Sequence, residues 1–72
     1  MKKINKIKIK LNGKISEITN NLTLLGYIKK LKVPLKKVAI ELNQEIIDKN
    51  NLKAIKLKND DKIEIVHFIG GG

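Results

Sequence analysis

Alternating apolar and polar residues open the chain. Residues 7–11 place isoleucine or leucine at every second position with lysines between them, which is typical of a strand with one buried face. Asn12-Gly13 follows directly, and both central positions of a type I′ turn need the positive φ that Asn and Gly adopt readily. Alternation then resumes over residues 14–18. This part of the chain predicts a β-hairpin.

The spacing of apolar residues changes to a helical period after position 22. Leucine and isoleucine recur three and four residues apart between positions 24 and 31, and lysines occupy much of the opposite side. Thr23 is suited to cap the first turn, because its hydroxyl can accept a hydrogen bond from a free backbone N–H. Pro34 disfavours helical geometry at the residue before it. The pattern predicts one helix of about three turns that ends before Pro34.

Shorter segments follow the predicted helix. Residues 38–42 alternate again, Asn43-Gln44 is a turn candidate, and residues 46–47 begin a short return strand. Residues 48–53 indicate a loop with one helical turn, and residues 54–57 indicate a short extended piece. These segments predict a second, smaller strand pair joined by irregular chain.

The last strand is expected over residues 62–68, after a turn at Asn59-Asp60-Asp61. It carries apolar residues on both faces, and Val66 and Phe68 share one of them. This is typical of a central strand, or of one that docks on something outside the domain. The order of hairpin, helix and further strands predicts an α+β fold, a mixed sheet of four to five strands with one main helix packed on one face.

Charge is the most conspicuous feature of the composition. The 72 residues include 16 lysines and no arginine, and the net charge is +9. Arginine provides the planar fork for bidentate recognition of phosphate and guanine, and only Tyr27 and Phe68 could stack on bases. The lysines therefore favour solvation or an acidic partner over sequence-specific nucleic-acid binding. No apolar stretch approaches the roughly 20 residues that cross a membrane, so we expect a cytoplasmic protein.

The residues that could carry catalysis are few. The chain has no cysteine, which excludes disulfides, thiolate catalysis and cysteine-based metal sites. His67 is the one histidine and Ser16 the one serine, and the two lie in different predicted strands. Asp60 and Asp61 are neighbours in a turn, where their carboxylates diverge. We expect no metal site, and for His67 both a strand position and a partner contact stay open.

The chain closes with Phe68-Ile69-Gly70-Gly71-Gly72. One interpretation is a frayed end. The other is an acyl carrier: three glycines can extend about 10 Å, and without a Cβ they fit a channel whose walls approach the backbone closely. The α-carboxyl is ionised at neutral pH. As a poor electrophile it needs activation by an ATP-using partner.

Four segments resemble the ThiS family of thiamine-biosynthesis sulfur carriers: residues 8–14, 22–25, 38–43 and 61–72. The resemblance is most specific in the last segment, Asp-Lys-Ile-Glu-Ile-Val-His-Phe-Ile-Gly-Gly-Gly. It implies a ubiquitin-like β-grasp domain over residues 1–69 and a flexible glycine tail over residues 70–72. The chain departs from the family at Asn43-Gln44 and at Asn59-Asp60-Asp61, where Asn-Gly and Asp-Gly-Asp are usual.

The resemblance also implies a role as a protein co-substrate rather than an enzyme. An E1-like adenylyltransferase would use MgATP to adenylate Gly72, and sulfur from a cysteine desulfurase pathway would convert it to a thiocarboxylate for thiazole synthase. Gly70 and Gly71 would thread the partner's channel. His67, Phe68 and Ile69 would contact the partner. We expect a free monomer that binds no cofactor of its own.

Three alternatives stay open from the sequence. One is the sister sulfur carrier of molybdopterin synthesis, which shares the fold and the diglycine end. Another is a small basic nucleic-acid-binding module, whose affinity would fall steeply with salt. The third is a protein modifier that is conjugated to lysines.

Overall fold

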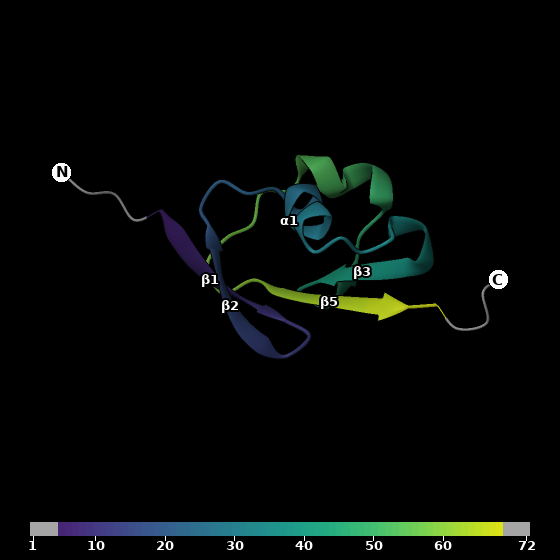
Figure 1. Ribbon diagram of the computed structural model, residues 1–72, viewed down its shortest axis with the longest axis horizontal. Helices are drawn as coiled ribbons and strands as arrows, with labels where there is room; N and C mark the ends of the chain where they lie inside the picture. Colours follow the sequence, from purple (N-terminus) through teal and green to yellow (C-terminus); the bar gives the residue numbers. More distant parts are fainter. Residues whose placement is uncertain (1–4, 69–72) are drawn as a thin grey trace.

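The computed structural model of the protein describes residues 5–68 as a five-stranded mixed sheet with the helix α1 packed on one face (Figure 1). The elements in chain order are β1 Lys6–Leu11, β2 Lys14–Thr19, α1 Leu24–Lys30, the 3₁₀ helix η1 Leu35–Lys37, β3 Val38–Leu42, β4 Glu45–Ile46, the 3₁₀ helix η2 Lys49–Ala54 and β5 Lys62–His67. The strand order is β2-β1-β5-β3-β4. The α+β prediction is confirmed.

The hairpin forms as its pattern predicts. Strands β1 and β2 pair antiparallel from Lys6 opposite Thr19 to Leu11 opposite Lys14. Asn12 and Gly13 have φ values of 50° and 85°, the left-handed geometry of a type I′ turn. The alternation of lysine and isoleucine in β1 thus sets which face of this part of the sheet meets the helix.

Helix α1 begins where its cap predicts but is shorter than its apolar period suggests. The Thr23 hydroxyl accepts a 3.0 Å hydrogen bond from the Gly26 backbone N–H. The helix ends at Lys30 after two turns rather than three, because Lys32 adopts a left-handed φ of 60° before Pro34 is reached. None of the helices in residues 5–68 is long and apolar enough to cross a membrane.

Strand β5 occupies the centre of the sheet, as its two apolar faces predict. It pairs parallel with β1 on one side and antiparallel with β3 on the other. Asn12 ties the hairpin turn to β5: its N–H donates to the Ile63 carbonyl at 2.8 Å, and its Oδ1 accepts from the Ile65 N–H at 2.8 Å. The position and register of β5 are therefore fixed from both sides.

The core lies between the sheet and the layer formed by α1 and η2 (Figure 1). Its buried side chains are Ile9, Ile18, Leu24, Tyr27, Ile28, Val38, Ile40, Leu52, Leu57 and Ile63. The prediction of an extended piece over residues 54–57 is wrong for Ala54, which is the last residue of η2. In the rest of this segment, the strand pairing consists of an isolated bridge between Lys56 and Thr23. Leu52 and Leu57 explain the difference, because the chain between them turns to bury both.

The turn at Asn43-Gln44 is left-handed at two successive residues, neither of which is glycine. Asn43 and Gln44 have φ values of 51° and 74°. The Asn43 side chain supports this geometry, since its Oδ1 accepts from the Lys62 N–H at 2.9 Å and its Nδ2 donates to Asp61 at 3.0 Å. Gln44 has no side-chain hydrogen bond within the described residues and holds the left-handed conformation at a cost of about 1–2 kcal/mol.

Candidate functional site

The candidate site is the end of β5, from which the chain leads to its glycines. His67, the last residue of β5, lies opposite Val38 at the start of β3. The Phe68 N–H donates a 2.9 Å hydrogen bond to the Lys37 carbonyl, which continues the ladder one residue beyond the strand. The backbone is therefore held as far as Phe68. Because β5 is central, the chain leaves the sheet from its middle rather than from an edge (Figure 1).

Apolar side chains are exposed beside this exit. Phe68 is 56% exposed and Val66 is 49% exposed, although large apolar side chains are usually covered in a small domain. The Lys49 ammonium lies 5.5 Å from the centre of the Phe68 ring, within the range of a cation–π contact. The alternate residues of β5 behave differently: Ile63 is buried and Ile65 half-buried. The sequence offers two explanations for apolar residues on both faces of this strand, a central position in the sheet and docking on something outside the domain, and the strand order confirms the central position.

His67 is exposed at the end of β5 and has no side-chain hydrogen bond among residues 5–68. No group of three potential metal ligands forms in this part of the chain. Ser16 lies in β2, opposite Ile9 of β1, rather than beside His67. Burial raises the pKa of the Tyr27 phenol, and the Ser16 side chain acts in the opposite direction. The arrangement offers no activated nucleophile.

The remaining predicted site residues, Ile69 and Gly70 to Gly72, lie outside the described residues. Conversely, the structure assigns two contacts that sequence patterns do not indicate, the carbonyl of Lys37 and the ammonium of Lys49. Both lysines come from segments remote in sequence from Phe68. Among sixteen lysines, none carries a signal that would have singled these two out.

Comparison with known proteins places this architecture in one family. The sequence model of the ThiS family matches residues 9–72. The sulfur carrier protein ThiS of Bacillus subtilis is 37% identical over 65 residues, which cover 89% of this chain and 98% of that protein. The crystal structure of a thiamine biosynthesis protein (ThiS) from Geobacter metallireducens has a TM-score of 0.81 at 30% identity, over 92% of this chain and 100% of that one.

Longer relatives contain a similar segment. The thiazole synthase of Magnetococcus marinus is 41% identical over 66 residues, which cover 92% of this chain. This chain spans about a fifth of that relative, since the match covers 20% of its length. The family match extends over nearly all of β1 to β5 and reaches the last glycine. The chain belongs to the ThiS family.

Proposed function

We propose that the protein is a sulfur carrier of thiamine biosynthesis, and that the carboxylate of Gly72 is the group that carries the sulfur. Membership of the ThiS family and the likeness to the Bacillus carrier over almost its whole length support the proposal. The observation that carries it is the family match, which continues to Gly72 from a central strand held in place as far as Phe68. The chain itself is a co-substrate, and the chemistry belongs to its partners.

The carboxylate needs activation because it is a poor electrophile. An E1-like adenylyltransferase would join Gly72 to AMP and release pyrophosphate from MgATP. A persulfide from a cysteine desulfurase pathway would then attack the acyl carbon, release AMP and leave an acyl disulfide. A thiol would reduce the sulfur–sulfur bond and free the thiocarboxylate. In this proposal the ATP is bound by the activating enzyme, and the carrier itself needs no cofactor of its own.

In this proposal the described residues hold the C-terminal segment in position for a partner and take no part in the chemistry. The bond from Phe68 to Lys37 fixes the point from which residues 69–72 leave the domain. Exposed Phe68, with His67 and Ile69 beside it, would form the contact at the mouth of a partner's channel, since buried aromatic anchors dominate interface energies. Gly70 and Gly71 would pass through a channel too narrow for side chains.

Thiazole synthase is the acceptor of the sulfur in this proposal. A segment similar to this chain occupies a fifth of proteins named thiazole synthase, which supports a physical association between the two. Ordering the tail in either partner costs about 1–2 kcal/mol per residue of backbone entropy. The apolar contact at Phe68 and backbone hydrogen bonds in the channel would offset that cost.

Intact mass spectrometry tests the proposal. The chain is incubated with MgATP, the activating enzyme and a sulfur source, and a chain lacking Gly72 serves as the control. We expect the full chain to gain the mass difference between sulfur and oxygen, placed on Gly72 by fragmentation. The truncated chain should gain nothing and unfold at the same temperature. Sulfur loading of the truncated chain, or a native protein that continues beyond Gly72 without trimming, would contradict the assignment.

A further inference from the structure

Like charges lie side by side on the face of the sheet that faces away from α1. Lys10 of β1 is directly opposite Lys62 of β5, and we call these two residues the lysine pair. Glu41 of β3 is directly opposite Glu64 of β5, and we call these two the glutamate pair. Opposed like charges on a sheet are destabilising, whereas opposed unlike charges are favourable.

The two pairs adjoin each other. Lys62 and Glu64 are alternate residues of β5, so their side chains lie on the same face of that strand. An exchange of these two residues would place opposite charges side by side at both positions without changing the net charge. The natural placement of Lys62 and Glu64 and the exchanged placement have the same composition and net charge. Of the two, the sequence holds the one with the less favourable cross-strand charge pairs. Departures of this kind from local rules are expected at functional surfaces.

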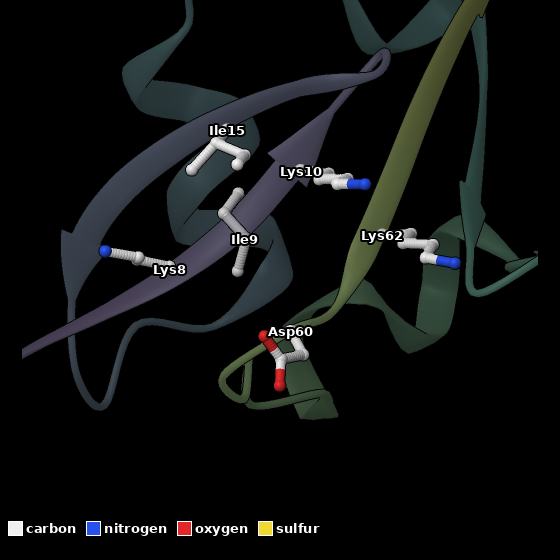
Figure 2. A pocket seen from close by; sticks show the side chains of 6 residues that line it. All are labelled: Lys8, Ile9, Lys10, Ile15, Asp60 and Lys62. Carbon is white, nitrogen blue, oxygen red and sulfur yellow. The ribbon is translucent and has the colours of Figure 1, made fainter.

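The lysine pair borders a shallow pocket shown in Figure 2. Lys8 and the lysine pair line it, together with Ile15, whose side chain is 68% exposed, and Asp60 on the loop before β5. In Figure 2 the ammonium groups of the lysine pair point to the same side of the sheet. An exposed apolar side chain beside three lysines, with Asp60 as the one carboxylate, is suited to a surface that combines carboxylates with an apolar residue.

We infer that this face is a docking surface for a partner protein with carboxylates opposite the lysine pair and a basic side chain opposite the glutamate pair. The inference rests on the proposed function, in which the partner is the protein that receives the tail. Val66 lies farther along the same face of β5, and Phe68 follows directly after the strand. A partner on the charged part of β5 would therefore also reach the exit of the tail.

The charge pattern decides between classes of partner. Nucleic acid presents a uniformly negative backbone, which the glutamate pair would repel at the centre of the face. A second copy of this chain would meet the pattern in antiparallel orientation, but two chains of net charge +9 repel each other. A predominantly acidic protein surface with one basic position fits the lysine pair and the glutamate pair together.

The test exchanges the two residues of β5, Lys62→Glu with Glu64→Lys, and keeps the net charge. The probes are the activating enzyme and thiazole synthase, with Kd measured by calorimetry and the KM for sulfur loading measured by mass spectrometry. We expect Kd and KM for at least one of these proteins to rise about tenfold, while kcat for loading stays within twofold. A second comparison sets Lys10→Glu against Lys53→Glu, which makes the same charge change on exposed η2. Only Lys10→Glu should weaken binding.

Each other outcome has a distinct meaning. Unchanged Kd and KM in the exchange variant, with normal loading of the wild type, overturn the docking surface and leave the proposed function intact. Failure of the wild type to load contradicts the proposed function instead. If the exchange abolishes binding of a DNA or RNA oligonucleotide, or dissociates a dimer seen by ultracentrifugation, the face serves that partner and the protein-docking inference is wrong.

Discussion

Replacement of Phe68 by alanine separates docking from folding. The ring is 56% exposed, and an aromatic side chain offers about 200 Å² of surface. About 110 Å² of Phe68 is therefore free to be covered by a partner. At about 25 cal/mol per Å², complete burial is worth up to about 3 kcal/mol. Incomplete burial and ordering of the side chain reduce this value, so we expect Kd for the partner to rise about 10- to 100-fold in Phe68→Ala.

The fold should tolerate the same change. The free domain loses the cation–π contact with Lys49, worth about 0.5–1 kcal/mol at an exposed site. It also loses the covered part of the ring, for which area bookkeeping gives at most about 2 kcal/mol. The backbone bond from residue 68 to the Lys37 carbonyl remains. We expect a native circular dichroism spectrum and a thermal midpoint lowered by about 4–8 °C for each kcal/mol lost.

Two variants serve as controls for the Phe68 experiment. Phe68→Leu keeps most of the apolar surface and should restore most of the affinity. Lys49→Ala removes the cation and leaves the ring, so it should lower stability by at most about 1 kcal/mol without weakening binding tenfold. Calorimetry with the activating enzyme and with thiazole synthase measures the affinities. If Phe68→Ala binds both proteins with wild-type affinity, the reasoning from exposed area is refuted.

Three predictions concern the sheet itself. Asn12→Ala should lower the free energy of unfolding by about 1–2 kcal/mol in urea titrations, because it removes the bond to the Ile65 N–H and strains a left-handed turn. The control Asn20→Ala removes only a bond to the neighbouring residue and should have little effect. Equal losses of stability in the two variants would contradict the role of Asn12. Gln44→Gly should raise the same free energy by about 0.5–1 kcal/mol, because relief of the left-handed strain exceeds the entropy cost of glycine; a loss of stability would show that the turn is not strained. The exchange of Lys62 and Glu64 should stabilise the free domain by about 0.2–1 kcal/mol per new ion pair at low salt, and a gain that persists in 1 M salt would rule out charge as its origin.

Local patterns predict most elements of this fold because each pattern reflects one physical requirement. The alternation before Asn12-Gly13 predicts the hairpin, and the hydroxyl of Thr23 predicts the start of α1. The end of α1 is predicted less well. Pro34 limits how far the helix can extend, but the left-handed conformation of Lys32 ends it earlier. Lysine has no particular preference for that conformation, so the sequence does not predict it.

Contacts between distant segments are the part that patterns in the sequence leave open. The parallel pairing of β1 with β5 brings Lys10 beside Lys62, and nothing in either strand alone indicates it. The position of Lys49 over Phe68 likewise depends on how η2 packs. The exposed end of β5 is predictable, because apolar residues on both faces of a strand imply that one face meets something else. The charges that surround that end cannot be predicted in this way, because they come from other segments of the chain.

Strand β5 combines both proposed contacts in one run of alternate residues. Its face away from α1 presents Lys62, Glu64 and Val66, followed by Phe68, so charge gives way to apolar surface in the direction of the tail. A shift of one residue would present Ile63 and the residues that alternate with it instead, because side chains alternate between the two faces. The hydrogen bonds of Asn12 and of the Asn43 turn oppose such a shift at the start of β5. The turns that stabilise the sheet therefore also determine which residues a partner meets before it reaches the tail.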